Sequence, residues 1–291
     1  GYVSPLFYGD LLLYPAALLV AAGCPVAVAF RLFLASIMMG AWLSMYLCVK
    51  AVWGRETAVL ASYLYAFSPI LLADIFIRFA VGEALAFVFL PIVLYGFYRI
   101  VLEPKKPKTD WIWLSVGMSG LIFSHIISTV LTVFMLVLLC LFFVRKIWAN
   151  KKSFGYLAAA AVLTVFLTAY FTWPMLEQMA TTPLFVTDRQ TSNLAGNVAP
   201  VVGLFFGSEY FNLLNVIAEK LTGQADLFVT TWFPGAFGYL LFFVLVVRLR
   251  KKDRVENKNA DILLGFSIFY LAISMVPFIQ PLLEPIVGFI K

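Results

Sequence analysis

The chain has 291 residues, of which 63% are hydrophobic and only 12% are charged, and its mean hydropathy is +0.96. Soluble proteins average about 45–50% apolar and about 25% charged residues, so this chain has too few polar groups to build a water-facing surface. The composition excludes a secreted, disordered or nucleic-acid-binding chain. It predicts a polytopic membrane protein, with the lipid bilayer as its first partner.

The chain opens with an apolar run, Leu11 to Ala22, that is too short to cross a bilayer, because a membrane span needs about 20 residues. We therefore predict an interfacial or re-entrant helix within an external segment at residues 1–25. Asp10 precedes this run, and its carboxylate either caps the helix N-terminus or faces a lipid-linked substrate. Because the first residue is Gly1 rather than methionine, we expect the N-terminus to lie upstream.

Longer apolar runs predict the membrane helices. They lie at residues 27–49, 57–75, 82–101, 155–176, 230–248 and 261–280. The run from Trp111 to Val144 would extend about 51 Å as one helix, against a hydrocarbon core of about 30 Å, so we predict two helices that turn near Ser124 and His125. The predicted fold is all-α, with about eight membrane helices, two of them a short hairpin, in one transmembrane domain over residues 1–291.

Most of the 21 basic residues lie in short loops between the predicted spans. These loops contain Lys50 and Arg55, residues 99–108, residues 145–152 and residues 248–258. The positive-inside rule places such loops in the cytoplasm, which explains the net charge of +6 without nucleic acid. The opposite side carries many acidic residues and one long connection, residues 177–229, so we expect the chemistry of the protein on the external face.

A group of charged residues, Asp74, Arg78 and Glu83, joins two predicted spans on the external side. One interpretation is a carboxylate pair for acid–base or metal chemistry, with a guanidinium that binds phosphate. The other is an i,i+4 ion pair between Asp74 and Arg78, with Glu83 near a helix N-terminus. If the first holds, we expect these groups to line one external groove with Asp10 and His125, which continues into an apolar slot for a lipid tail.

The single histidine, His125, lies at the predicted external tip of the hairpin. A histidine in a polar turn is typically a structural hydrogen-bonding group, but a position facing the acidic residues also suits substrate binding. Cys24, Cys48 and Cys140 stand isolated in apolar surroundings, and we expect buried, inert thiols. No phosphate loop, nucleophile elbow or metal-ligand spacing is present, so no cofactor is indicated beyond a possible divalent metal on the carboxylates.

Three stretches carry a resemblance to a known family: residues 1–15, residues 68–91 and residues 119–126. The second includes Ser68-Pro69 and Gly82-Glu83, and the third reads Ser-Gly-Leu-Ile-Phe-Ser-His-Ile. Together they resemble a bacterial integral membrane family labelled 6-pyruvoyl-tetrahydropterin synthase-related, which is itself similar to the GT-C superfamily of membrane glycosyltransferases. The resemblance covers most of the chain and is strongest up to about residue 130.

The resemblance implies a GT-C-like fold and the transfer of a sugar from a polyprenyl-phosphate donor to an unidentified acceptor, at the external face of the cytoplasmic membrane. The principal catalytic carboxylate would lie upstream of this chain, and Asp74 and Glu83 match a second acidic site. On this hypothesis Asp74, Glu83 and Asp10 are catalytic, and Arg78 and His125 bind substrate. The alternatives are a transporter or flippase for a lipid-linked substrate and a non-catalytic assembly subunit. The absence of ionisable groups in the middle of the predicted spans argues against a transporter.

Overall fold

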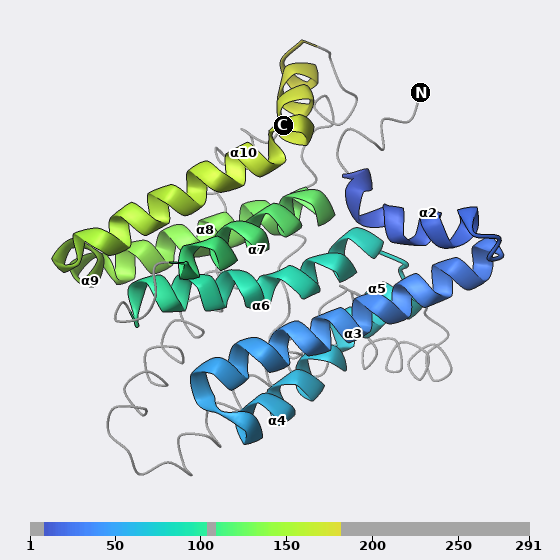
Figure 1. Cartoon of the computed structure of the whole chain (residues 1–291), viewed down its shortest axis with the longest axis horizontal. Helices are drawn as coiled ribbons and strands as arrows, with labels where there is room; N and C mark the ends of the chain where they lie inside the picture. The colour runs from blue at the N-terminus through green and yellow to red at the C-terminus, as the bar shows by residue number, and fades with distance from the viewer. Residues whose placement is uncertain (1–8, 104–108, 182–291) are drawn as a thin grey trace, which may run out of the picture. The chain divides into compact units, whose positions relative to one another are not determined.

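The computed structural model describes residues 9–103 and 109–181, and these residues are helical, with no strand among them. All of them except Ser68–Ile70 belong to one compact unit, which is the unit considered below. Along the chain (Figure 1) the elements are the 3₁₀ helix η1 (Asp10–Leu13), α2 (Tyr14–Ala21), α3 (Val26–Trp53), α4 (Arg55–Ala66), α5 (Pro69–Phe76), α6 (Val81–Val101), α7 (Asp110–Ser124), α8 (Ile126–Phe142), α9 (Val144–Ala149) and α10 (Lys151–Thr181).

Three of these helices, α3, α6 and α10, are each long and apolar enough to cross a membrane. They correspond to the predicted spans 27–49, 82–101 and 155–176. The described part of the chain therefore has the helices of a membrane protein, as its composition predicts. The predicted spans 230–248 and 261–280 lie outside the described residues, so the predicted number of eight membrane helices stays a prediction.

The predicted span 57–75 is not one straight helix. The structure divides it into α4 and α5, which bend by 45° at the break and would form a fourth span only as a pair. The reason is Pro69, which has no backbone N–H to donate and disfavours the helical conformation of the residue before it. The prediction of a continuous helix was therefore wrong, and the break brings the short helix α5 to the site described below.

The predicted hairpin is confirmed. Helix α7 ends at Ser124 and α8 begins at Ile126, and between them His125 has an extended backbone, with φ −157° and ψ 112°. The short N-terminal helix is confirmed as well, since η1 and α2 together end at Ala21.

Helices α6 and α7 lie against each other along their length, and glycines allow the close approach. A Cβ atom on Gly96 would lie 2.5 Å from the backbone nitrogen of Leu114, and one on Gly117 would lie 2.7 Å from a methyl carbon of Val93. Helix α10 is joined to α7 where the Ser115 hydroxyl donates to the Ala160 carbonyl over 3.0 Å. These contacts fix the position of α6 along α7, and with it the positions of the ends of both helices.

A second packing centre holds α5 against α3 and α6. Phe33 and Ile37 of α3, Leu71 and Ile75 of α5, and Ala84 of α6 are buried in one hydrophobic cluster. Burying apolar surface stabilises this contact by about 25 cal/mol per Å². This packing fixes the position of α5, although the helix has only eight residues.

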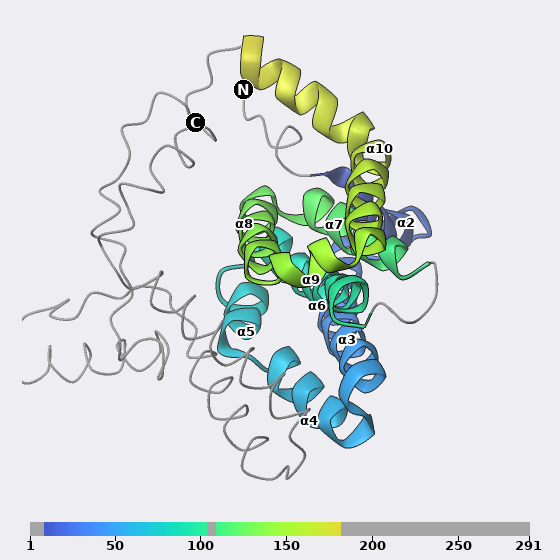
Figure 2. The same cartoon turned by 90° about the vertical axis from the view of Figure 1, so that its left-hand side faces the viewer.

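The two ends of the helical unit differ in charge. The α3–α4 junction, the C-terminal end of α6 and helix α9 lie at one end, on the left of Figure 1 and toward the viewer in Figure 2. This basic end carries Lys50, Arg55, Arg99, Arg145, Lys146, Lys151 and Lys152. The α5–α6 turn, the α7–α8 break and η1 lie toward the opposite end, called the cluster end below.

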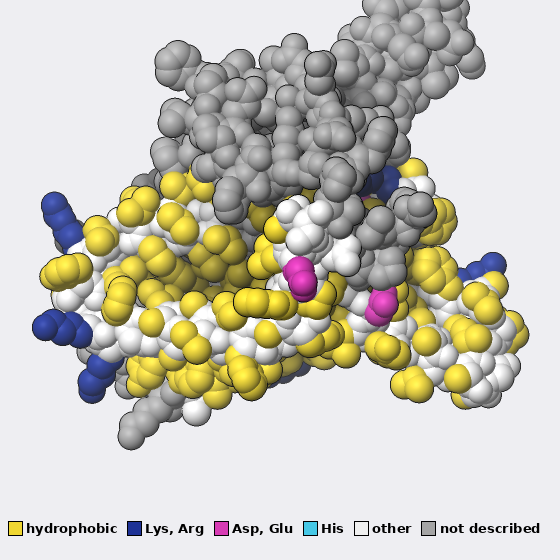
Figure 3. Space-filling model, turned by 90° about the horizontal axis from the view of Figure 1, so that it is seen from above, with side chains coloured by type: hydrophobic (Ala, Val, Ile, Leu, Met, Phe, Trp, Pro, Cys, Tyr) yellow, Lys and Arg dark blue, Asp and Glu magenta, His cyan; other side chains and the backbone are white. Residues whose placement is uncertain are grey.

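Between the two ends the surface is apolar. Hydrophobic side chains cover most of the described part of the face in Figure 3, and basic side chains lie mainly at its left margin, with others on its right side. On α10, Val162, Phe166 and Trp173 are 70%, 78% and 73% exposed. Lipid, rather than water, is the solvent in which such side chains are stable, and this supports a membrane setting for the described helices.

We expect the two ends to face opposite sides of the membrane, the basic end inward. In a background without the three native cysteines, Ile77→Cys in the α5–α6 turn and Trp148→Cys in α9 test this, because both native side chains are exposed. A membrane-impermeant thiol reagent should label Ile77→Cys in intact cells and label Trp148→Cys only after permeabilisation. Labelling of Trp148→Cys in intact cells would overturn the topology.

Candidate functional site

The site begins at a tight turn between α5 and α6. Phe79 has φ 53°, the left-handed region that bulky side chains rarely adopt, and the N–H of Ala80 donates to the Asp74 carbonyl over 2.9 Å. The turn reverses the chain within a few residues, so that the first turn of α6 comes back to the end of α5. Glu83 lies in that first turn, where the helix dipole favours a negative charge.

Arg78 occupies the centre of the site. Its NH1 group donates to Asp74 Oδ1 over 2.8 Å and to Glu83 Oε2 over 2.7 Å, and its NH2 group donates to Glu83 Oε1 over 3.2 Å. The hydrogen bond to Glu83, with the charges of both carboxylates, raises the pKa of Arg78, so the guanidinium stays charged. The predicted i,i+4 pair between Asp74 and Arg78 is present, and Glu83 forms an ion pair with the same guanidinium.

The two carboxylates differ in access to solvent. The side chain of Asp74 is completely buried, and within the described residues its Oδ2 atom has no hydrogen-bond partner. The side chains of Arg78 and Glu83 are 33% and 28% exposed. A molecule that approaches from outside therefore reaches Glu83 and Arg78, while Asp74 holds the guanidinium from within.

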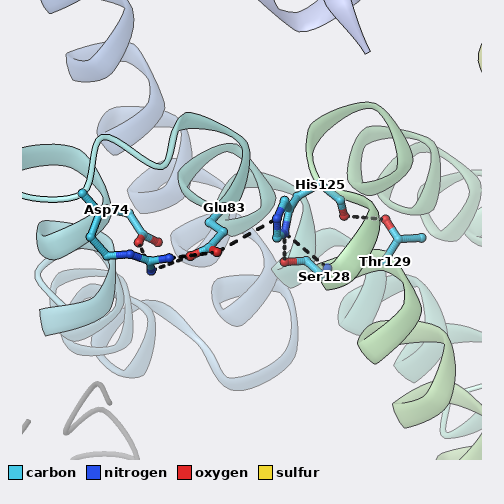
Figure 4. Close-up of polar contacts among 6 residues, drawn as sticks. Asp74, Glu83, His125, Ser128 and Thr129 are labelled. Atoms are coloured by element: carbon cyan, nitrogen blue, oxygen red, sulfur yellow. Dashed lines mark hydrogen bonds and ion pairs between the residues drawn. The ribbon is translucent and has the colours of Figure 1, made fainter. Parts of the chain in front are cut away.

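His125 links the α7–α8 break to the same group of charges, as Figure 4 shows with Glu83 between Asp74 and His125. Its Nδ1 atom accepts the Ser128 N–H over 3.3 Å, so the side chain of His125 caps α8. The same Nδ1 atom lies 2.8 Å from the Ser128 hydroxyl oxygen. Its Nε2 atom lies 4.0 Å from Glu83 Oε1. Because Nδ1 accepts from a backbone N–H, the neutral ring carries its proton on Nε2, the nitrogen that faces Glu83.

We call Asp74, Arg78, Glu83, His125 and Ser128 the polar cluster. It is assembled from α5, the turn that follows α5, α6 and the start of α8. The two carboxyl groups of the cluster, Asp74 and Glu83, share the single guanidinium of Arg78. The cluster can accept a proton at Glu83, but it becomes a good anion site only when Arg78 is released from one of its carboxylates.

Burial lowers the pKa of His125, partly opposed by the charge of Glu83, while Arg78 adds to the lowering. Near pH 7.5 the ring is neutral in both the folded and the unfolded protein. As the pH falls below the ordinary imidazole value of 6.5, the unfolded chain binds a proton that the folded chain resists, so folding stability decreases. The decrease in unfolding midpoint between pH 7.5 and pH 5.5 should therefore be smaller in His125→Asn, which keeps a good N-cap residue without the titration. Equal decreases in both proteins would contradict this.

Asp10 is not part of the polar cluster. It lines a separate pocket of about 480 Å³, formed by η1, α2 and α10, whose lining contains no residue of the polar cluster. Of the five residues predicted to line one groove, Asp10, Asp74, Arg78, Glu83 and His125, only Asp10 lines this pocket. The predicted capping role of Asp10 was wrong, because the N-cap of η1 is Gly9 and no side-chain cap hydrogen bond is present in η1 or α2. Asp10 already lies inside the first turn, beyond the capping position.

Some features of the site have no clear signal in the sequence. Ser128 is one of several serines in apolar helices, and only the break at His125 makes it a partner of the imidazole.

Cys24, Cys48 and Cys140 are half-buried rather than buried, and none forms a disulfide. Among the described residues, no group of three or more histidine, cysteine, aspartate or glutamate side chains is arranged to hold a metal ion.

Comparison of the chain with protein-family models, curated proteins and solved structures gives no match. The function must therefore be argued from the geometry. The polar cluster combines a charged hydrogen-bond donor, a solvent-accessible carboxylate and an imidazole at one end of a set of apolar helices. This combination suits the binding of a phosphate and the removal of a proton at the surface of a membrane.

Proposed function

We propose that the protein is a membrane glycosyltransferase of the GT-C type, which takes a sugar from a polyprenyl-phosphate donor at the external face of the cytoplasmic membrane. The observation that carries the proposal is the bridged guanidinium of Arg78, held by Asp74 and Glu83 next to His125 at the cluster end. A lipid-linked phosphate has its charge at the lipid–water boundary and its tail in the bilayer. The location of Arg78 at the end of apolar helices matches both requirements.

The differences in burial suggest different roles for the two carboxylates. Asp74 is fully buried and cannot reach an acceptor molecule, so we assign it as a positioning residue that orients the guanidinium. Glu83 is partly exposed and lies in the first turn of α6, and we assign it as the base that removes the proton of the acceptor hydroxyl. The Nε2 atom of His125 lies 4.0 Å from Glu83 Oε1, so a small movement of Glu83 on release from Arg78 would bring the two groups within hydrogen-bond distance.

The N–H groups of Arg78 that face the polar cluster already bind Asp74 and Glu83, so donor binding implies an exchange of partners. Two phosphate oxygens would take N–H groups of Arg78 that now bind Glu83, because a guanidinium binds phosphate in the same two-pronged geometry as a carboxylate. Glu83 would then be free to accept a proton. Donor binding would thereby prepare the base, and an empty site would hold the base inactive.

In the proposed step, the carboxylate of Glu83 takes the proton of the acceptor hydroxyl while the hydroxyl oxygen attacks the anomeric carbon of the donor sugar. The bond between that carbon and the phosphate oxygen breaks, and its electron pair leaves with the polyprenyl phosphate. Arg78 stabilises the additional charge on this leaving group. The products are a glycoside with inverted configuration at the anomeric carbon, the lipid phosphate and protonated Glu83.

A transfer assay in vesicles tests this proposal. The full chain is reconstituted and supplied with a panel of polyprenyl-phosphate sugars that carry a radiolabelled sugar. We expect the label to leave the lipid fraction with one donor, at a rate that depends on the amount of protein. Movement of the intact labelled lipid between leaflets without transfer would indicate a flippase instead. Neither transfer nor movement with any donor would favour a non-catalytic subunit.

A further inference from the structure

We propose that the pocket between η1, α2 and α10 binds a neutral, hydroxyl-rich ligand, a sugar, and that this ligand is the acceptor of the transfer reaction. Only the role of this sugar as acceptor rests on the proposed function. The sugar site itself follows from the residues of the pocket. The pocket is lined by Asp10, Tyr14, Tyr170 and Phe171, with Pro174 and Met175 beside them. Its volume of about 480 Å³ is within the range of about 300–1,000 Å³ that is typical of small-molecule sites.

The polar groups of the pocket include acceptors of hydrogen bonds and two tyrosine hydroxyls, which both donate and accept. Asp10 contributes a carboxylate. Pro174 lies inside α10 and has no N–H, so the carbonyl of Tyr170, one turn earlier, does not receive the usual helical hydrogen bond from it. A ligand that both donates and accepts hydrogen bonds suits this pocket, as the hydroxyl groups of a sugar do.

The charge of the pocket differs from the charge that a donor phosphate needs. Among the described residues, its lining contains one carboxylate and no lysine, arginine or histidine. A phosphate would be repelled by Asp10 and would find no cation, so this pocket does not bind the head group of the donor. The three aromatic residues Tyr14, Tyr170 and Phe171 offer ring faces on which the C–H face of a sugar ring packs, while the tyrosine hydroxyls remain available for hydrogen bonds.

The pocket is connected to the polar cluster through the end of α7. The centroid of the Phe123 ring lies 5.4 Å from the centroid of the Tyr170 ring and 6.0 Å from that of the Phe171 ring. On the other side, a Cβ atom on Gly9 would meet the carbonyl oxygen of Phe123 at 3.0 Å. Phe123 is followed by Ser124 and then His125, so a ligand in the pocket lies beside the segment that faces Glu83. In the proposed arrangement the acceptor hydroxyl extends from the pocket past this segment toward Glu83.

Equilibrium binding to the detergent-solubilised full chain tests the site with three radiolabelled probes: methyl glycosides of common hexoses, choline and inorganic phosphate. We expect a glycoside to bind and phosphate not to compete with it. Tyr170→Leu, which removes the ring and the hydroxyl, should weaken glycoside binding at least fivefold, and Asp10→Asn should weaken it as well. Tyr63→Leu is the matched control, because Tyr63 is similarly exposed (52% against 62%) and also packs on a phenylalanine, but it lies in α4.

Two results overturn the inference: no glycoside binds the wild-type protein, or choline binds and is lost in Tyr170→Leu, which would make the pocket a cation site. Transfer kinetics separate this inference from the proposed function. If the protein transfers sugar but Tyr170→Leu leaves the acceptor KM unchanged, the acceptor binds elsewhere and only the pocket assignment fails. If a glycoside binds with the expected dependence on Tyr170 while no donor is used, the glycosyltransferase proposal fails and the sugar site stands.

Discussion

Replacing Arg78 with alanine should lower the rate of sugar transfer by about 30- to 1,000-fold, which corresponds to roughly 2–4 kcal/mol of lost transition-state stabilisation. The physical reason is that charge develops on the leaving phosphate, and in the described structure Arg78 is the cation that Glu83 and Asp74 hold at the cluster end. The transfer assay with the best donor of the panel measures the effect. Asp74→Asn should act in the same direction, because the guanidinium loses its buried partner.

Arg31→Ala is the matched control, since Arg31 is an exposed arginine near the start of α3, and it should leave the rate unchanged. Lys106→Ala, in a predicted cytoplasmic loop outside the described residues, should also be silent. Removal of Arg78 leaves Asp74 and Glu83 without their cation, so Arg78→Ala with Glu83→Gln shows whether a loss of protein comes from the unpaired charge. Normal transfer by Arg78→Ala and Asp74→Asn at normal membrane abundance would leave only a structural ion pair.

Replacing Gly96 with alanine should destabilise the protein by about 1–3 kcal/mol, because the added methyl group needs space that α7 occupies. Its nearest neighbours would be the backbone nitrogen and Cα of Leu114, at 2.5 Å and 2.8 Å, and a backbone cannot move aside as a flexible side chain can. The two helices would have to separate. The unfolding midpoint in detergent measures the loss.

Gly155→Ala is the control for this prediction. Gly155 also lies inside a helix, α10, but nothing lies within 4 Å of a Cβ atom there. Alanine should therefore stabilise the protein by about 0.5–1 kcal/mol through helix propensity alone. If Gly96→Ala were as stable as Gly155→Ala, the close packing of α6 on α7 would be refuted.

The sequence by itself determined the long apolar helices and the break at His125, because these depend on local properties. Runs of apolar residues predicted α3, α6 and α10, and the excessive length of the run 111–144 predicted the break at His125. The helices extend beyond the apolar runs, as α10 does from the predicted 155–176 to Lys151–Thr181, because charged and polar residues continue a helix at its ends. The Ser68-Pro69 break within the predicted span 57–75 was also readable from the proline, but the apolar pattern obscured it.

Only the tertiary structure decided which charged residues meet. Asp74 and Arg78 are four residues apart, so their pairing was predictable, but the contact of Arg78 with Glu83 depends on the left-handed backbone of Phe79. The approach of His125 to Glu83 depends on the register of α6 against α7, which is determined by the close contacts at Gly96 and Gly117 and not by any local pattern. The same packing places Asp10 in a pocket with residues of α10, far along the chain, and the lining of this pocket contains none of the acidic residues with which the sequence had grouped Asp10. Such contacts join residues that are distant in sequence, and a hydropathy profile contains no information about the rotation of one helix against another.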